Sequence, residues 1–381
     1  MQRRERIPVT IVTGFLGAGK STLLNRILKD PEMKDAAVII NEFGDVGIDH
    51  LLVETSGDSI IELADGCLCC TVRGELVDTL AMLMDGMQTD RIRPLKRIVI
   101  ETTGLADPAP VMQSVMGNPV IAMNFELDGI VTVVDAVNGQ QTLDNHIEAV
   151  KQAAVADRLV ISKATLAGTE TVAALTERLR ALNPRTAIID GDADEAGGAA
   201  LLVNGLYDPA TKIADVARWL GAEDAHAHGH DHQGHGHGHH QHGHDHHHHH
   251  HDVNRHGDAI RSFSIVHDKP IDPAALEMFV DLLRSAHGER LLRMKAIVCL
   301  SADPDRPVVL HGVQNVFHPP ARLPAWPDPA DRRTRMVLIT KDLPEAFVTD
   351  LFDAFTGTPR IDRPDRAALE DNPLAIPGFK M

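Results

Sequence analysis

The sequence predicts an α/β fold with a mostly parallel sheet, followed by a smaller α+β domain. Two observations support this prediction. Between residues 8 and 189, short runs of β-branched residues alternate with longer helical patterns, as in βαβ units whose parallel sheet is covered on both faces. After residue 258, strand patterns cluster with few helices between them, which favours a separate α+β unit.

The expected elements follow from these patterns. In the first part, strands are expected at 8–12, 37–40, 97–100, 129–134, 158–161 and 186–189, and helices at 20–28, 75–84 and 169–182. In the second part, strands are expected at 260–266, 294–300, 308–313 and 336–340, and helices at 273–286 and 344–355.

A histidine-rich tract separates the two parts. Of the 23 histidines, 17 lie between His226 and His256, mixed with Gly, Asp and Gln and without apolar patterning. Such a segment cannot bury a core, so we expect a flexible linker whose neutral imidazoles collect Zn, Ni, Co or Cu ions. The run of six from His246 to His251 resembles an expression tag, but it is internal and continuous with His-Gly and His-Asp repeats. The predicted division is 1–222 for the first domain, 223–257 for the linker, 258–358 for the second domain and 359–381 for an irregular tail.

The net charge, the apolar runs and the cysteines indicate which classes of protein this sequence does not resemble. Lys and Arg total 37 against 54 for Asp and Glu, and the net charge of −17 disfavours a nucleic-acid partner, because phosphate backbones select basic surfaces. No apolar run reaches the roughly 18 residues that a membrane helix needs, which disfavours a membrane protein. Three of the four cysteines are clustered, as in a metal or redox site of a reducing compartment, so a cytoplasmic protein is expected. The fourth, Cys299, lies in an apolar stretch and is expected to be a buried thiol.

The strongest motif is Gly14-Phe-Leu-Gly-Ala-Gly-Lys20-Ser21, which fits G-x-x-x-x-G-K-[ST] between an expected strand and an expected helix. Backbone N–H groups of such a loop wrap phosphate oxygens, and the helix N-terminus adds a favourable dipole. Lys20 would act in catalysis by neutralising the β- and γ-phosphates, and Ser21 would offer its hydroxyl to Mg²⁺. A glycine-rich turn without a ligand is the alternative, which the flanking elements disfavour. The first domain is therefore predicted to be a phosphate-loop NTPase.

Acidic residues follow two further strands. Glu101 ends the apolar strand 98–100 and precedes Gly104; in phosphate-loop enzymes an acid at this point lies near Mg²⁺ and the attacking water, and the glycine can sense the γ-phosphate. Glu101 would thus be catalytic, holding Mg²⁺ through water or polarising the nucleophile, and the alternative is a surface acid that caps a strand. Glu42 and Asp45 lie where a switch segment is expected, and they are candidate ligands of Mg²⁺ or of a second metal. Acids in a loop that are only solvated are the alternative there.

Cys67, Cys69 and Cys70 form a candidate metal site. Thiolates bind Zn²⁺, Co²⁺ or Cu⁺ strongly, and a Cys-x-Cys pair can place two sulfurs on one ion. A catalytic disulfide is the rival interpretation, but its motif is C-x-x-C, which Cys67 and Cys70 satisfy only trivially. A structural zinc site would show a second Cys/His pair at fixed spacing, and none is clear. The incomplete ligand set suits transient binding and transfer of the ion.

The order GFLGAGKS, NEFGDVGID, GCLCC, ETTGLADP and VDA, with LLRMKAIV and HGVQNVF in the second domain, resembles the CobW family of metallochaperone GTPases. That family belongs to a wider class with the nickel chaperones UreG and HypB. The resemblance covers nearly the whole chain and implies that Glu101 and Gly104 form the second switch and that the three cysteines hold a cargo ion, Zn²⁺ or Co²⁺. It also implies that GTP and Mg²⁺ bind at Gly14, Gly17, Ala18, Gly19, Lys20, Ser21 and Thr22.

One segment departs from the family pattern. The guanine-reading element of the family resembles [NST]-K-x-D, and the aligned residues here are Ser162, Lys163, Ala164 and Thr165. Ser162 and Lys163 remain candidates for nucleotide binding, but Thr165 stands where the acid is expected. Its neutral hydroxyl cannot match the two-fold acceptor geometry of a carboxylate. The sequence leaves open a protein that accepts ATP and one that binds guanine through another group.

The sequence therefore predicts a GTPase of low turnover that binds a transition metal, zinc or cobalt, and transfers it to a client metalloprotein. GTP and Mg²⁺ would order the switch loops, and hydrolysis would relax them and change the affinity for the ion or the client. The alternative is a metal store in which the nucleotide is a structural or regulatory feature. A small-molecule kinase is disfavoured, because no Arg-rich lid is found. A homodimer is compatible with the sequence.

Overall fold

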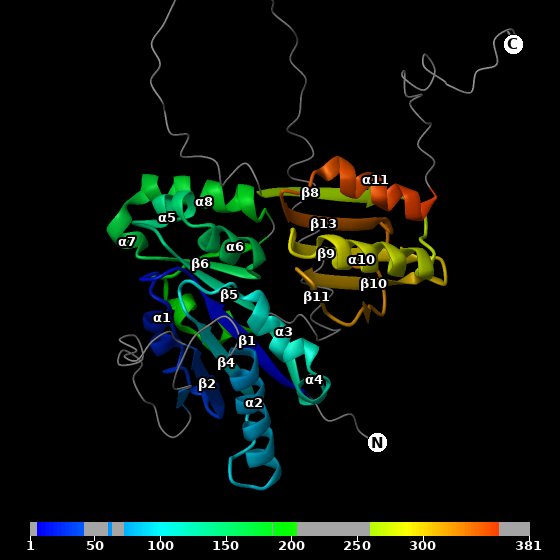
Figure 1. Cartoon of the computed structure of the whole chain (residues 1–381). Helices are drawn as coiled ribbons and strands as arrows, with labels where there is room; N and C mark the ends of the chain where they lie inside the picture. Colours follow the sequence, from blue (N-terminus) through cyan, green and yellow to red (C-terminus); the bar gives the residue numbers. More distant parts are fainter. Residues whose placement is uncertain (1–5, 42–59, 63–71, 185, 204–259, 358–381) are drawn as a thin grey trace, which may run out of the picture.

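The computed structural model describes residues 6–41, 60–62, 72–184, 186–203 and 260–357, which form two domains packed side by side (Figure 1). Among the described residues, the first domain has a sheet of seven strands in the order β3-β2-β4-β1-β5-β6-β7. Every pair of neighbours in this sheet is parallel. The strands are β1 (Ile7–Thr13), β2 (Ala36–Asn41), β3 (Ile60–Glu62), β4 (Arg97–Thr102), β5 (Phe125–Asp135), β6 (Arg158–Ser162) and β7 (Ala187–Asp190).

Helices cover both faces of this sheet, and the strands supply apolar side chains to each face. In β4, Ile98 and Ile100 pack in the cluster with α2 and α3, whereas Val99 between them packs in the cluster with α1. This alternation of two buried faces explains why the strands are apolar nearly throughout. The helices are α1 (Lys20–Ile27), α2 (Val72–Gln88), α3 (Ala109–Gly117), α4 (Pro119–Asn124), α5 (Gly139–Asn145), α6 (Ile147–Val155), α7 (Ala164–Ala167) and α8 (Thr169–Leu182), with 3₁₀ turns η1 (Pro31–Met33), η3 (Asp194–Gly197) and η4 (Ala199–Leu202).

The second domain is an antiparallel sheet with two helices packed on it (Figure 1). Its path is β11-β10-β9-β13-β8, and β12 pairs with β10. Helix α10 begins at an N-cap, Asp272, whose carboxylate accepts from the N–H groups of Ala274 and Ala275. Cys299 is buried as expected, and burial raises the pKa of its thiol. The elements are β8 (Ile260–His267), α10 (Pro273–His287), β9 (Leu291–Leu300), β10 (Asp303–Val313), β11 (Val316–Phe317), β12 (Ala321–Arg322), β13 (Thr334–Lys341) and α11 (Glu345–Thr356).

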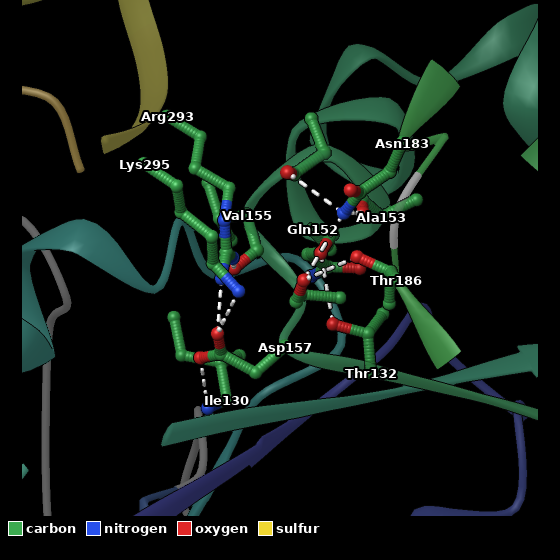
Figure 2. Close-up of polar contacts among 12 residues, drawn as sticks. Ile130, Thr132, Gln152, Ala153, Val155, Asp157, Asn183, Thr186, Arg293 and Lys295 are labelled. Atoms are coloured by element: carbon green, nitrogen blue, oxygen red, sulfur yellow. Dashed lines mark hydrogen bonds and ion pairs between the residues drawn. The ribbon is translucent and has the colours of Figure 1, made fainter. Parts of the chain in front are cut away.

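The two domains share buried surface along α6. Leu292 and Ile339 of the second domain belong to the same apolar cluster as Val150 and Ala153 of α6. At the end of the helix, the guanidinium of Arg293 donates to the carbonyl of Val155 and to the carboxylate of Asp157 (Figure 2). Lys295 Nζ lies 3.1 Å from the same carboxylate oxygen. Apolar packing and a buried ion pair therefore join the domains along α6.

The predicted fold class is confirmed, and each strand and helix expected by range is present, most of them with ends shifted by a few residues. The helix expected at 169–182 matches α8 at both ends. The strand expected at 129–134 is too short, because β5 begins at Phe125. Glu126 and Asp128 interrupt the apolar pattern there, but Arg6 pairs with Glu126 at 2.9 Å and Arg97 pairs with Asp128 at 2.8 Å, which lets the strand continue. The proposed domain boundaries at 222 and 257 lie outside the described residues.

Candidate functional site

The phosphate loop joins β1 to α1 at the centre of the parallel sheet. Gly14 has φ of +143°, and a Cβ at that position would lie 2.3 Å from the carbonyl oxygen of Val133, so only glycine lets the loop pass β5. Gly19 has φ of +93° and is the N-cap of α1. The N–H of Ala18 donates to the carbonyl of Phe15 at 3.1 Å, which closes the turn. The sequence motif thus forms a tight loop that leads directly into a helix N-terminus.

Three of the predicted residues converge below this loop, although Glu101 is distant in sequence from Lys20 and Ser21. Lys20, Ser21 and Glu101 are all buried. Lys20 Nζ donates to the carbonyl of Gly14 at 3.1 Å, which holds the ammonium group against the loop. Ser21 Oγ donates to Glu101 Oε1 at 3.2 Å, across 80 residues of sequence. Thr22, the next residue of α1, is exposed.

The oxygen atoms of Ser21 and Glu101 fit a hard divalent cation. Mg²⁺ takes oxygen ligands and is usually held by one or two protein groups together with substrate phosphates. A hydroxyl from the first turn of α1 and a carboxylate from the end of β4 are such a pair. Both side chains are buried at the foot of the phosphate loop, and they are the described residues that could hold Mg²⁺.

The segment after β4 packs directly on the phosphate loop. A Cβ on Gly104 would lie 2.4 Å from the backbone nitrogen of Leu16, so the two loops touch through their backbones. Gln152 of α6, itself buried, donates through Nε2 to the carbonyls of Gly104 and Ala106 at 3.1 and 2.9 Å. A displacement of Gly104 would therefore be transmitted to α6.

The same segment also contacts the second domain. Asp107 Oδ2 accepts from Lys151 Nζ of α6 at 3.0 Å. It accepts from Gln314 Nε2, which follows β10 in the second domain, at the same distance. Asp107 therefore links the strand end that carries Glu101 to both α6 and the second domain.

Ser162 and Lys163 bind the phosphate loop from the end of β6. Ser162 Oγ donates to the carbonyl of Ala18 at 2.6 Å, and Lys163 Nζ donates to the carbonyl of Gly17 and to Asp135 Oδ2, both at 2.8 Å. Lys163 has φ of +56°, a conformation that is uncommon for a residue with a side chain and is held here by these bonds. Burial alone would raise the pKa of Asp135, but the hydrogen bonds from Lys163, Asn138 and Val137 outweigh it and lower that pKa.

Thr165, which stands in place of the expected acid, has a carboxylate as its partner. Its backbone N–H and its hydroxyl each donate to Asp192 Oδ2 at 2.9 Å. Asp192 lies just after β7, the strand beside β6. The backbone N–H of Thr165 lowers the pKa of Asp192 more than any other group does, and the hydroxyl of Thr165 lowers it further.

The other predicted metal ligands lie outside the described residues. They are Glu42, Asp45, Cys67, Cys69 and Cys70. The histidine tract from His226 to His256 also lies outside them. Within the part of the chain that the structure describes, no group of three or more His, Cys, Asp or Glu side chains could hold a metal ion. Nor does any described helix have the length and apolarity needed to cross a bilayer.

This geometry agrees with the comparison to known protein families. The nucleotide-binding domain described as CobW/HypB/UreG matches residues 8–190, and the cobalamin synthesis protein cobW C-terminal domain matches residues 260–356. The chain is 31% identical over 349 residues to the zinc chaperone YjiA of Escherichia coli K12, which covers 91% of this chain and 98% of that protein. The chain belongs to the CobW/HypB/UreG family.

A further relative and a solved structure are also similar to this chain of the CobW/HypB/UreG family. The zinc-regulated GTPase metalloprotein activator 1 of Schizosaccharomyces pombe is 36% identical over 191 residues, covering 48% of this chain and 45% of that protein. The crystal structure of Zn(II)-bound YjiA GTPase from Escherichia coli aligns with a TM-score of 0.62 at 26% identity. That alignment covers 92% of this chain and 99% of the YjiA chain, so it includes both domains.

Three residues of this CobW/HypB/UreG-family site were missed by sequence reasoning. Asp135 and Asp192 both lie at the carboxyl edge of the parallel sheet, where ligands of open α/β sheets bind, and this position is a signal that could have found them. Gln152 lies inside a helix, and its sequence context contains no comparable signal. Only the packing of α6 against the segment after β4 reveals its role.

Proposed function

We propose that this chain is a GTP-hydrolysing metallochaperone that binds zinc and transfers it to a client protein. The observation that carries the proposal is the convergence of Lys20, Ser21 and Glu101 at a phosphate loop to which Ser162 and Lys163 are bonded. Membership of a nucleotide-binding family supports the nucleotide. The names of the relatives in Escherichia coli and Schizosaccharomyces pombe support zinc and GTP.

In this proposal each residue of the loop has a defined task. The backbone N–H groups from Gly14 to Gly19 and the ammonium group of Lys20 hold the phosphate oxygens. Ser21 and Glu101 would hold Mg²⁺, which when bound would neutralise charge that develops on the phosphates. Glu101 would also orient the attacking water. A preformed loop of this kind catalyses hydrolysis mainly by positioning and electrostatics.

Hydrolysis would be transmitted through the segment after β4. In phosphate-loop enzymes, contacts to the γ-phosphate hold the second switch segment in place, and hydrolysis releases that segment. Gly104 lies at the corresponding position of this chain. In this chain Gly104 is bonded to Gln152 and leads to Asp107, whose partners include Gln314 of the second domain. The nucleotide state would therefore reach α6 and the second domain through hydrogen bonds. This coupling is how a slow hydrolase would produce a conformational output.

The cargo ion would bind the thiolates of Cys67, Cys69 and Cys70. Sulfur ligands select Zn²⁺ over hard cations, and the cysteines lie in sequence between the two proposed switch segments, one with Glu42 and Asp45 and the other with Glu101. Glu42 and Asp45 remain candidate ligands for Mg²⁺ or for the cargo. A client metalloprotein would receive the ion. A homodimer formed with GTP is a further part of the proposal, which light scattering with and without the nucleotide tests.

Zinc titration with and without a non-hydrolysable GTP analogue tests the mechanism. The full chain should show one tight zinc site whose affinity changes with the analogue. Replacing the three cysteines by Ser should abolish this site, whereas deleting residues 226–251 should remove several weaker ions and leave it intact, because a flexible chain loses entropy on ordering. The Lys20→Ala variant is the matched control, since it should keep the tight zinc site but lose its response to the nucleotide. Cobalt titrated in parallel tests the choice of ion.

A metal store is the second candidate, and the histidine tract with 17 of the 23 histidines is the observation that favours it. A store predicts that the tight site survives replacement of Cys67, Cys69 and Cys70 and disappears with the tract. It also predicts that the nucleotide leaves zinc affinity unchanged. Either result would contradict the metallochaperone mechanism proposed here.

A further inference from the structure

The base-reading loop of this protein presents a hydroxyl, that of Thr165, where its family pattern has a carboxylate. Guanine presents two adjacent donors, the N1–H and the exocyclic amine, and a carboxylate accepts from both at once. A threonine hydroxyl offers one small acceptor and cannot reproduce that pattern. A guanine-selective site in this chain therefore needs an acceptor from another residue.

Asp192 brings a carboxylate to this position from the neighbouring strand end. Oδ2 accepts from both the N–H and the hydroxyl of Thr165, each at 2.9 Å. These hydrogen bonds lower the pKa of Asp192, so the group is charged at neutral pH. The residue is exposed, which leaves its carboxylate accessible to a ligand. A charged acceptor thus lies one hydrogen bond away from the residue that replaces the expected acid.

The loop that carries Asp192 is fixed on both sides. Arg26 of α1, the helix that begins in the phosphate loop, donates to the carbonyl of Gly191 and, at 2.7 Å, to that of Ala193. The N–H of Gly191 donates to the carbonyl of Ile161 at 2.7 Å, and a Cβ on Gly191 would lie 2.8 Å from that oxygen. Asp192 therefore lies between Gly191, which is bonded to α1 and β6, and Ala193, which is bonded to α1.

We propose that Asp192 reads the guanine base in place of the missing acid, with Thr165 holding its carboxylate at the base-reading loop. This inference rests on the proposed function, because it assigns base selectivity to the same nucleotide site. Ser162 and Lys163 fix the start of the loop on the phosphate loop, and Asp192 completes its far end. Adenine is disfavoured because its N1 is an acceptor, which would face the carboxylate.

A purely structural role for Asp192, as a cap on the short helix α7, makes a different prediction. The Asp192→Asn side chain keeps one acceptor oxygen for Thr165 and has nearly the same shape, but its second polar atom becomes an amide donor. That donor opposes the exocyclic amine of guanine and matches the C2 carbonyl of xanthine. Base reading therefore predicts a change of selectivity, whereas capping predicts an equal change for every base.

Isothermal titration of the full chain with GDP, ADP and XDP in the presence of Mg²⁺ tests the proposal without interference from hydrolysis. The wild-type protein should bind GDP more tightly than ADP. Asp192→Asn should lower GDP affinity about ten- to a hundredfold, as expected for a lost charge-assisted hydrogen bond, and should bind XDP more tightly than GDP. Asp194→Asn, which removes an exposed acid two residues further along, should leave the order of affinities unchanged. The double variant Thr165→Asp/Asp192→Asn should restore the preference for GDP.

Two results would overturn this assignment. One is a wild-type protein that binds ADP as tightly as GDP, and the other is an Asp192→Asn variant whose affinities for all three nucleotides change by the same factor. Both results leave the proposed zinc cycle standing, because Lys20 and Ser21 contact phosphate rather than base and zinc binding is measured separately. Conversely, Asp192→Asn could switch its preference to XDP while the zinc affinity of the protein does not change with nucleotide. That combination would support base reading by Asp192 and contradict the metallochaperone mechanism.

Discussion

Replacing Asp157 by Asn should weaken the contact between the two domains. Asp157 Oδ1 accepts from Arg293 and lies 3.1 Å from Lys295 Nζ, while Oδ2 accepts from the N–H of Ile130 at 3.0 Å (Figure 2). The side chains of Asp157 and Arg293 are only 8% and 7% exposed. The Asn side chain keeps the shape but removes the negative charge, so the buried guanidinium loses its carboxylate partner. We expect the variant to unfold more easily.

The magnitude follows from the burial of the pair. Breaking a buried ion pair by removing one partner costs about 3–5 kcal/mol, because the other charge stays desolvated. Asp144→Asn is a matched control in the same domain. Asp144 and Arg178 lie 2.7 Å apart, but they are 33% and 29% exposed, so its loss should cost at most about 1 kcal/mol.

The penalty should also depend on pH. Burial by itself would raise the pKa of Asp157, but Arg293 and Lys295, together with His311 and the N–H of Ile130, outweigh it and hold that pKa well below its usual range. A depressed folded-state pKa means that the carboxylate contributes its full stability above the unfolded-state pKa of about 3.9 and loses it as the pH falls toward the folded-state pKa. The difference between wild type and variant should therefore be about 1 kcal/mol smaller at pH 3 than at pH 7.

Urea unfolding followed by circular dichroism at the two pH values measures these free energies. The expected result for Asp157→Asn is a lower midpoint or a separate early transition of one domain at pH 7. A penalty no larger than that of Asp144→Asn would show that the pair does not hold the domains together. A penalty that stays constant between pH 7 and pH 3 would refute the account of the pKa.

Three further predictions concern the nucleotide site. Lys20→Ala should abolish GTP hydrolysis while leaving the thermal unfolding temperature within a few degrees of wild type; turnover by the folded variant would contradict the phosphate-loop assignment. Gly104→Ala should reduce hydrolysis at least tenfold, because its Cβ would lie 2.4 Å from the phosphate loop, whereas Gly117→Ala, whose nearest neighbour would lie at 3.5 Å, should leave the rate unchanged. Lys163→Met should weaken nucleotide binding about tenfold in equilibrium titrations, since it removes the hydrogen bond to Gly17, and an unchanged affinity would mean that this bond does not shape the loop.

Local sequence determined the elements and the phosphate loop of this protein. Gly14, Lys20 and Ser21 lie within eight residues, so their spacing alone specifies a strand, a tight turn and a helix N-terminus. Runs of β-branched residues likewise predicted the strands, since a sheet buried on both faces requires them. The starts of two strands were missed: β5, where ion pairs to Glu126 and Asp128 allow polar residues inside a strand, and β10, which begins at Asp303 rather than at 308.

The tertiary structure decided which distant side chains meet. Ser21 contacts Glu101 because β1 and β4 are neighbours in the sheet, and Thr165 contacts Asp192 because β6 and β7 are neighbours. The order of strands cannot be read from spacing along the chain, since parallel strands are joined by crossovers and residues adjacent in the sheet are far apart in sequence. For that reason the sequence alone revealed a missing carboxylate at Thr165, and only the fold brought another carboxylate to it.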